Sequence, residues 1–158
     1  MPPNAMLSVR NYSPLDLDAV IDIFLRAIRE VASKDYNQAQ IDAWAQVDRA
    51  AWGKRRLSRP TWVALLGQAL VGFTDLEADG HLDMMFVCPA HQGIGVDSLL
   101  LKTVEAAAKS QGLSRLFTEA SITAKPFFEK RGFSIQAPQW VSKRGQALAN
   151  FRMEKILA

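Results

Sequence analysis

The stretch PAHQGIGVDSLLL, residues 89–101, follows an apolar run and leads into a helical pattern. The apolar residues of that pattern recur at spacings of three and four: Val96, Leu100, Val104 and Ala107. A glycine loop between a strand and a helix can receive an anion, because unpaired N–H groups and the positive end of the helix dipole meet there. Gly93 and Gly95 therefore indicate either an anion cradle or a turn that needs only a permissive backbone.

Two well-known phosphate loops do not fit this spacing. A dinucleotide fingerprint needs a third glycine, and Ser98 occupies that position. A Walker A loop needs Gly-Lys-Ser or Gly-Lys-Thr, which the stretch lacks. Any cradle here is of a different kind.

The composition is that of a chain that can form a hydrophobic core. It has 158 residues, 49% of them hydrophobic, and we expect a single domain over residues 1–158. The net charge of +3 is scattered without an arginine-rich stripe, so we expect no nucleic-acid partner. No apolar run approaches the ~20 residues of a membrane helix. A single cysteine, Cys88, and a start without the apolar segment of a signal peptide predict a cytoplasmic protein.

The first half of the chain carries strand and helix patterns in turn. Residues 7–10 predict a strand, and Ser13-Pro14 is typical of a helix start. The apolar face expected for that helix consists of Leu17, Ile21, Phe24, Ile28 and Val31. Further helices are expected at 37–46 and 48–57, and strands at 61–66 and 69–77 around a Gly67-Gln68 hairpin turn. A third strand is expected at 81–87.

The second half alternates in the same way. A helix at 96–112 is followed by a strand at 116–120, a short helix at 124–130, and strands at 133–135 and 151–156. This order predicts a mixed sheet with helices packed on it, in the α/β or α+β range.

Read with a second block, EASITAKPFFEKRGF at residues 119–133, the glycine loop resembles the GNAT superfamily of acetyl-CoA-dependent N-acyltransferases. The first motif of that family runs from a strand ending in Val-x-Pro into Arg/Gln-x-x-Gly-x-Gly/Ala and a helix; residues 87–89 and 92–97 match it. The second motif is a strand, a polar turn, a short helix with Phe-Tyr-Glu-Lys, and Gly-Phe; residues 127–133 match it. The resemblance covers nearly the whole chain. It implies a central mixed, mostly antiparallel sheet of six to seven strands with helices on both faces.

The resemblance also implies acetyl-CoA as co-substrate. In the family, loop amides bind the cofactor pyrophosphate, and a bulged strand before the loop holds the pantetheine arm and the thioester carbonyl. An N–H aimed at that carbonyl would stabilise the oxyanion formed on amine attack. Two polar residues, at 121 and 123, either touch the cofactor or cap the short helix. The expected cofactor residues are Met85, Phe86, Val87, Gln92, Gly93, Ile94, Gly95, Val96, Ser121, Thr123, Phe127 and Phe128.

The chain departs from the family pattern at two positions. Asp97 stands where the loop motif ends in a small residue, and its charge would repel a phosphate, so we expect the side chain to point away. Phe128 stands where many members have a tyrosine that protonates the leaving thiolate, which phenylalanine cannot do. This leaves open which group, if any, acts as the acid.

Three residues are candidates for proton transfer from the acceptor amine. Asp83 is the first candidate as a base, because it lies in an apolar strand where burial raises a carboxylate pKa; a structural hydrogen-bond acceptor is the alternative. Glu119, at the end of the next strand, is the second candidate. Tyr36 serves either as an acid or substrate contact or as an ordinary loop residue. Trp44 and Trp52 belong either to the core or to the acceptor pocket.

A metal site is the alternative chemistry. His81, Asp83, Cys88 and His91 have the softness that suits zinc. Strand alternation argues against it, because positions 81 and 83 share a face that position 88 leaves. We therefore expect no metal.

These observations predict an N-acetyltransferase that moves an acetyl group from acetyl-CoA to a primary amine of a small molecule, or less readily of a protein, by direct attack in a ternary complex. The alternative is a non-catalytic acyl-CoA-binding sensor or interaction module on the same fold. We expect no membrane partner. The oligomeric state stays open, and a homodimer is one expectation because dimers are common in the family.

Overall fold

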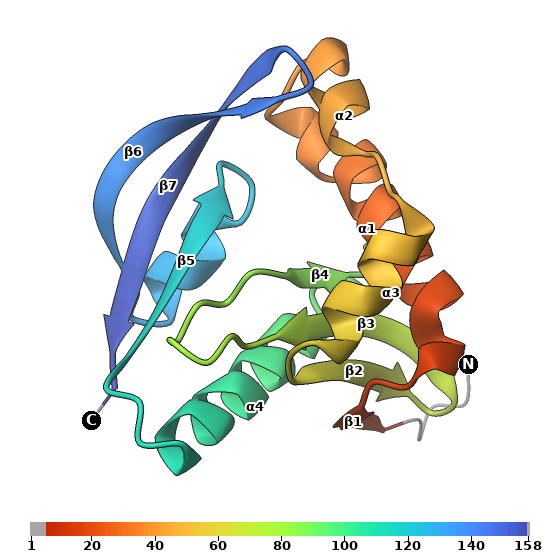
Figure 1. Cartoon of the computed structure of the whole chain (residues 1–158), viewed down its shortest axis with the longest axis vertical. Coiled ribbons are helices and arrows are strands. Elements are labelled where there is room, and N and C mark those ends of the chain that lie inside the picture. Colours follow the sequence, from red (N-terminus) through yellow and green to blue (C-terminus); the bar gives the residue numbers. More distant parts are fainter. Residues whose placement is uncertain (1–5, 158) are drawn as a thin grey trace.

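Seven strands divide between two sheets in the computed structural model, which describes residues 6–157 (Figure 1). The first sheet is antiparallel, in the order β1 (Leu7–Asn11), β2 (Thr61–Leu66), β3 (Ala69–Asp75), β4 (Met85–Val87). The second has the order β5 (Arg115–Ser121), β7 (Gln146–Ile156), β6 (Ser134–Lys143). A parallel bridge between His81 and Phe117 joins the two sheets. The mixed α/β class, with mostly antiparallel strands, is confirmed; the expected central sheet is divided where β4 and β5 diverge.

Five α-helices surround the sheets: α1 (Leu17–Glu30), α2 (Gln38–Trp44), α3 (Arg49–Leu57), α4 (Val96–Ser110) and α5 (Lys125–Lys130). Short 3₁₀ turns lie at Pro14–Asp16, Ala32–Lys34 and Pro89–His91. The helical segments begin at capping residues that are recognisable in the sequence. Ser13 and Asp16 form a capping box, Asn37 and Gln40 form another, and Asp48 accepts the N–H of Ala51 at the start of α3.

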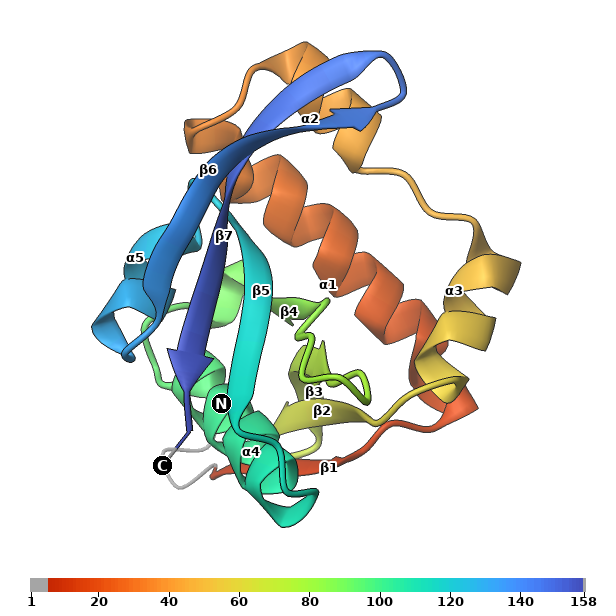
Figure 2. The same ribbon diagram turned by 60° about the vertical axis from the view of Figure 1, so that its left-hand side comes forward.

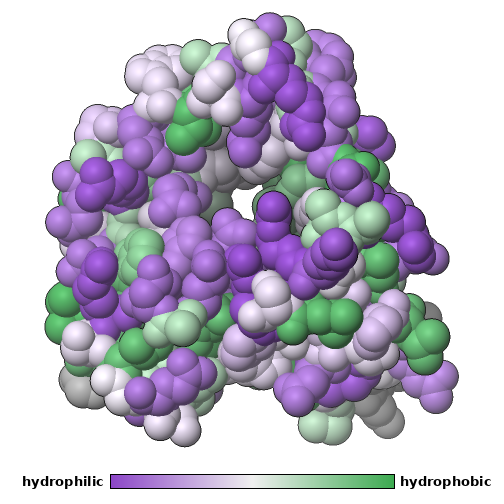
Figure 3. All heavy atoms as spheres, in the orientation of Figure 1, coloured by the Kyte–Doolittle hydropathy of each residue, from purple (hydrophilic) through white to green (hydrophobic). Residues whose placement is uncertain are grey.

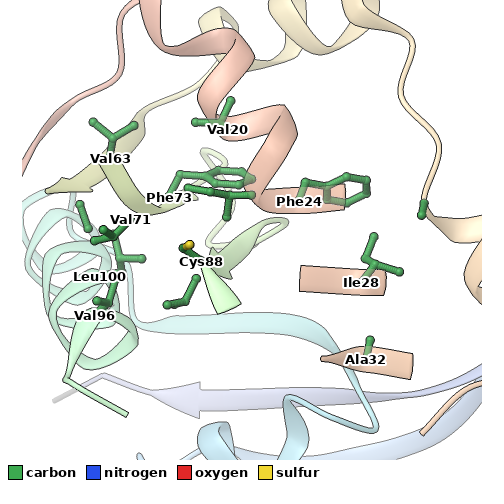
Figure 4. Packing of buried hydrophobic residues seen from close by; sticks show 14 of the residues in the cluster. Val20, Phe24, Ile28, Ala32, Val63, Val71, Phe73, Cys88, Val96 and Leu100 are labelled. Atoms are coloured by element: carbon green, nitrogen blue, oxygen red, sulfur yellow. The ribbon is translucent and has the colours of Figure 1, made fainter. Parts of the chain in front are cut away.

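Helices α1 and α4 pack on opposite faces of the first sheet. Phe73 of β3 lies among aromatic residues on the α1 side, in contact with Trp52 and Phe86. A Cβ on the preceding residue, Gly72, would lie 2.8 Å from Val96 of α4, so only glycine allows this close helix approach. Figure 4 shows this core, with Val20, Phe24 and Ile28 of α1 on one side and Val96 and Leu100 of α4 on the other.

The strand expected at 81–87 is shorter than its apolar run. Only Met85–Val87 pairs with β3, and this pairing is in regular register. The buried carboxylate of Asp75 accepts the backbone N–H groups of Asp83 at 3.0 Å and Met84 at 2.9 Å, which removes these amides from the ladder. The family resemblance maps a bulge onto Met85–Val87, but these residues pair regularly with β3, and the interruption lies just before them, at residues 82–84.

The final hairpin is much longer than the short strands expected at 133–135 and 151–156. Its two-residue turn, Arg144-Gly145, has positive φ at both positions (46° and 84°), as a tight hairpin requires. Pro138 obscured the first strand in the sequence, but β6 is an edge strand, which tolerates a missing N–H. The hairpin arches across the molecule and meets α2 (Figure 2).

Candidate active site

The candidate site lies where β4 and β5 separate. Near the bridge, the two segments run together: the N–H of Leu82 donates to the carbonyl of Phe117 at 2.9 Å, and the Thr118 hydroxyl donates to the carbonyl of Leu82 at 2.8 Å. Beyond this point β4 pairs only with β3, and β5 only with β7. Each strand is therefore a sheet edge with backbone groups available to a ligand. Two cavities adjoin the separation.

The first cavity is largely apolar, with a volume of about 150 Å³. Helix α1, strand β4 and the start of α5 form its walls. Eight of the twelve expected cofactor residues line it: Met85, Phe86, Val87, Gln92, Ser121, Thr123, Phe127 and Phe128. The motif blocks at 85–97 and 121–128, which are separate in sequence, thus meet around one space.

The glycine loop lies at one end of this cavity. Gly93 and Gly95 adopt φ of +76° and +94°, a region that residues with a side chain rarely adopt. No atom lies within 4 Å of a Cβ built on either residue, so the space beside the loop is open. Within residues 6–157, the backbone N–H groups of Gly95 and Val96 donate to no protein acceptor. The loop therefore has both the turn and the open donors of an anion cradle.

Asp97 is among the residues that line the first cavity, and its Oδ1 accepts the N–H of Ser98 at 2.8 Å. Arg131, which the sequence reading missed, donates to the Ser98 hydroxyl at 2.6 Å and stacks over Phe127 at 4.3 Å. A negative and a positive group thus both approach the first turn of α4. The Lys130-Arg131 pair before Gly132-Phe133 is the sequence feature that could have indicated a cation near this site.

Phe128 lies where the two cavities meet, since it lines both. It is 4% exposed and packs edge-on against Phe127 and Phe133. The position of the family's tyrosine is thus occupied by a buried apolar ring. No hydroxyl acts from it.

The second cavity, of about 440 Å³, is larger and more polar. It shares six lining residues with the first: Trp44, Met85, Phe86, Ser121, Ala124 and Phe128. Figure 3 shows the surface hollowed near the middle of this face, with hydrophilic residues gathered below the opening. All three catalytic candidates line the second cavity: Tyr36, Asp83 and Glu119.

Asp83 is held in an ion-pair network below the cavity. Its Oδ2 lies 3.3 Å from the guanidinium of Arg59, which also approaches Glu77 at 3.2 Å. Beneath it, Arg56 and Asp75 form a fully buried pair at 3.0 Å. Burial raises the pKa of Asp75 and lowers that of Arg56, while their mutual attraction opposes both shifts.

Glu119 is bound to a histidine that has a second carboxylate partner. Nε2 of His81 lies 2.7 Å from Oε1 of Glu119, and Nδ1 lies 2.6 Å from Oε1 of Glu77. The ring stacks on Phe117. The hydrogen bond to Glu119, supported by the one to Glu77, raises the pKa of His81 to about 9, so the ring is charged at neutral pH.

Tyr36 is buried and its hydroxyl is fully used. The hydroxyl donates to the carbonyl of Ala149 at 2.6 Å and accepts the N–H of Ile122 at 2.9 Å. Burial raises the pKa of the phenol. The residue ties the segment before α2 to the second sheet, so its hydroxyl has a structural task.

The remaining polar and aromatic candidates serve the fold and also line a cavity. Ser121 accepts the N–H of Ala124 at the start of α5, and Thr123 donates to Asp35 at 2.7 Å. Trp52 is a core residue, packed edge-on against Phe24. Trp44 is less buried and lines both cavities.

The four residues considered for zinc do not all converge: His81 and Asp83 form a group of close metal-ligating side chains with Glu77, without the other two. Among residues 6–157, Cys88 and His91 join no group of close metal-ligating side chains. Cys88 is buried in the core beside Arg26. Both ring nitrogens of His81 are hydrogen-bonded to carboxylates, which leaves none to bind an ion.

Asn150 is a second residue that the sequence reading missed. It lies on β7 directly opposite Ser121 and lines the second cavity. Its Oδ1 is buried without a hydrogen-bond partner among the described residues. A lone asparagine in a weakly alternating strand carries no sequence signal for this. An unpartnered buried amide oxygen costs free energy unless a ligand satisfies it.

Comparison with known proteins agrees with this geometry. Residues 32–155 match the model of the acetyltransferase (GNAT) domain family. The chain is 41% identical over 147 residues to the uncharacterized N-acetyltransferase YafP of Escherichia coli (strain K12), covering 93% of this chain and 94% of that protein. The crystal structure of a GCN5-related N-acetyltransferase (Aminotransferase, Class-II) from Rhodopseudomonas palustris superposes with a TM-score of 0.94 at 34% identity, covering 97% of both chains.

A second similar structure contains the cofactor. It is yncA, a putative acetyltransferase from Salmonella typhimurium with acetyl-CoA, with a TM-score of 0.72 and 20% identity over 98% of this chain and 95% of that one. The chain belongs to the GNAT family of acetyltransferases. It is an N-acetyltransferase whose co-substrate is acetyl-CoA, and family membership favours the enzyme over a non-catalytic module. Within residues 6–157 no helix is long and apolar enough to cross a membrane.

Proposed function

We propose that the enzyme acetylates a primary amine of a small molecule by direct attack within a ternary complex. The observation that carries this proposal is the pair of joined cavities, one apolar and lined by the cofactor motifs, the other polar and lined by carboxylates. The acetyl-pantetheine arm occupies the first, and the acceptor occupies the second. The shared wall at Met85, Phe86 and Ser121 is where the acetyl group and the amine meet.

The cofactor would be held by the backbone more than by side chains. The open N–H groups of Gly95 and Val96 at the glycine loop would bind its pyrophosphate. The free edge of β4 would bind the pantetheine arm as an added strand does. A β4 N–H aimed at the thioester oxygen would stabilise the charge that develops on amine attack.

The roof of the second cavity favours a small acceptor. Three contacts tie the final hairpin to the region of α2: Arg144 donates to the carbonyl of Ala43 at 2.7 Å, Gln40 to that of Ala147 at 2.9 Å, and Tyr36 to that of Ala149 at 2.6 Å. A lysine on a folded protein would have to reach past this closure. A free amine would not.

The charge beside the cavity favours a cationic acceptor. The network contains four carboxylates, Asp75, Glu77, Asp83 and Glu119, against three cations, Arg56, Arg59 and His81. The lining of the second cavity as a whole is balanced, with Asp48, Asp83 and Glu119 against Arg55, Lys143 and Arg144. The negative excess is therefore local to the network, and an ammonium group would be attracted there. The amine must then lose a proton before it attacks.

Glu119 is the candidate that best suits that proton transfer. Asp83 and Glu119 each use one oxygen for a cation, Arg59 and His81 respectively, but the side chain of Glu119 is the more exposed, 37% against 28%. The Tyr36 hydroxyl has two backbone partners. Glu119 uses Oε1 for His81, and no described residue donates to its Oε2. In the reaction the nitrogen bonds to the acetyl carbon, the C–S bond breaks with its electron pair leaving on sulfur, and the amine proton moves to Glu119. Coenzyme A leaves as a thiolate, because Phe128 has no proton to give.

An amine panel tests this proposal. Purified protein with acetyl-CoA is mixed with diamines, amino alcohols, amino acids, a lysine peptide and a folded lysine-rich protein, and thiol release and product mass are recorded. We expect acetylation of small primary amines and none of their tertiary-amine analogues. Acetylation of the peptide or protein alone would contradict a small-molecule acceptor.

A homodimer and a cytoplasmic location are further proposals from the sequence. Light scattering on the purified protein tests the first, and fractionation of cells that express it tests the second.

A further inference from the structure

The side chain of His81 connects the two sheets through a pair of carboxylates. Its ring lies between Glu77, from the turn after β3, and Glu119, from β5. We propose that His81 is a positioning residue, which fixes the carboxylate of Glu119 in the second cavity so that one oxygen faces the acceptor amine. This inference rests on the proposed function, in which Glu119 takes the amine proton.

His81 is itself held firmly. Its backbone N–H donates to Asp79 at 3.1 Å, its carbonyl accepts the N–H of Glu77 at 2.8 Å, and its backbone bridges to Phe117. The ring stacks on the Phe117 ring at 5.0 Å with an interplanar angle of 22°. Its side chain is only 17% exposed. With both nitrogens engaged, the ring has no freedom to turn.

Glu119 has no such support of its own. Its side chain is 37% exposed, and His81 is its only hydrogen-bond partner among the described residues. A glutamate free in a water-filled cavity samples many rotamers, and ordering it costs free energy. The bond to His81 removes that cost before the substrate arrives.

The two oxygens of Glu119 then have different tasks. Oε1 accepts the His81 N–H, and Oε2 receives the proton of the amine as the nitrogen bonds to the acetyl carbon and the C–S bond breaks. His81 keeps both of its protons throughout. It changes neither charge nor bonding during the step, which distinguishes a positioning residue from a proton relay.

The charged groups around the ring come from four elements. Asp79 and Asp83 flank it in the chain, and Arg59 lies 3.2 Å from Glu77. Arg152 of β7 lies opposite Glu119 in the strand register, and Arg115 stacks on Phe117 at 4.5 Å. The two short carboxylate contacts outweigh these cations, and the pKa of about 9 keeps the ring charged over the range in which amines are acetylated.

A purely structural link between the sheets is the competing explanation. It predicts that loss of His81 lowers stability and leaves the pH dependence of the reaction unchanged. A positioning role predicts a lower kcat, an unchanged KM for acetyl-CoA, and an altered pH profile. The two explanations are therefore separable by experiment.

The test uses His81→Gln, Glu119→Gln and the double variant, with the most reactive small amine of the panel as acceptor. His81→Gln keeps a donor but loses the charge. We expect kcat to fall about 10–100-fold, and the acidic limb of the kcat/KM profile to move to higher pH because a positive charge beside the base has gone. The double variant should be no slower than Glu119→Gln, since the two residues act as a unit.

The matched control is Glu105→Gln, which opens an ion pair of equal length, 2.6 Å to Lys155, away from both cavities. It should leave kcat and the pH profile unchanged. A His81→Gln enzyme with wild-type kcat and pH profile would overturn the positioning role, and so would effects of the two substitutions that multiply. Full activity in Glu119→Gln would instead remove the proposed base, which is a failure of the proposed function.

An NMR titration of the His81 ring needs no acceptor. The two carboxylate contacts of the ring predict a titration midpoint near pH 9. This midpoint should fall in both Glu77→Gln and Glu119→Gln. A wild-type midpoint near 6.5, the ordinary value, would directly contradict the two carboxylate contacts of the ring.

Discussion

The two cavities of this enzyme are built from the chain in different ways. The first cavity, where we propose that the cofactor binds, is formed mainly by two continuous blocks, residues 85–97 and 121–128, and by one face of α1. The second cavity, where we propose that the acceptor binds, takes its lining from at least five separate segments, from Phe24 to Asn150. The first is apolar and has few charges, while the second contains an ion-pair network. The chemistry shared by the family thus lies in local motifs, and acceptor selection lies in long-range packing.

The largest effect is expected where the local motif is broken. Gly95→Glu places a side chain and a negative charge in the open space of the loop, at a φ of +94°. A like charge about 4 Å from a phosphate costs about 4 kcal/mol near a protein surface, so acetyl-CoA affinity should fall about 1000-fold. Titration calorimetry measures the loss.

Gly112→Glu is the matched control for that change. Gly112 lies just beyond the opposite end of α4, also with positive φ (+76°) and open space around its Cβ. Both variants carry the same backbone strain, which costs about 1 kcal/mol of stability. Only Gly95→Glu should lose the cofactor. Equal affinity in the two variants would mean that the loop glycines only turn the chain.

The same contrast explains what the sequence could predict. Helix starts at Ser13, Asn37 and Asp48 and the Gly67-Gln68 hairpin depend on neighbours within a few residues, and all were predicted. Local spacing encodes such features because capping, turns and helical faces are short-range.

The features that were missed depend on partners on other elements of the fold. The strand at 81–87 is interrupted because the buried Asp75, on the neighbouring strand β3, takes two of its amides. Arg131 reaches the Ser98 hydroxyl at the start of α4 from the second motif block, 33 residues along the chain. The pairing of His81 with Glu119 requires two sheets to meet. No periodicity records these contacts.

A smaller effect is expected at Asn150, on the acceptor side. Asn150→Leu removes a buried amide whose oxygen has no protein partner in the described chain. If the acceptor satisfies this group, its KM should rise about 5- to 100-fold, the effect of about 1–3 kcal/mol, while acetyl-CoA affinity stays unchanged. Steady-state kinetics with the panel amine measure both.

Gln139→Leu is the control for Asn150→Leu. Gln139 lies opposite Asn150 on β6 but lines neither cavity. It should leave both kinetic constants unchanged. A drop in thermal stability of Asn150→Leu with an unchanged KM would assign Asn150 to the fold instead of the acceptor.

A still smaller effect, of opposite sign, is expected at Asp97. Asp97→Asn removes the charge near the cofactor phosphates and keeps an oxygen for the Ser98 N–H. Acetyl-CoA should bind about 2- to 5-fold more tightly at low ionic strength, and the gain should vanish near 1 M salt, where the Debye length is about 3 Å. Glu105→Gln removes a charge from the same helix away from its first turn and should show no gain. Weaker binding by Asp97→Asn would mean that the carboxylate supports the cofactor.

The last effect is on the stability of the fold and depends on pH. His81 has a folded-state pKa of about 9 against an ordinary value of 6.5, so the charged ring stabilises the fold. Because the folded pKa is the higher one, this stabilisation is complete below pH 6.5 and is lost as the pH rises through 9. The difference in melting temperature between wild type and His81→Gln should therefore be largest near pH 6 and shrink steadily to about pH 10. A difference that grows with pH would reverse the sign of the linkage. Acetyl-CoA affinity should show no such difference between the two proteins, because His81 does not line the cofactor cavity. A parallel pH trend in cofactor binding would mean that the two cavities are electrostatically coupled.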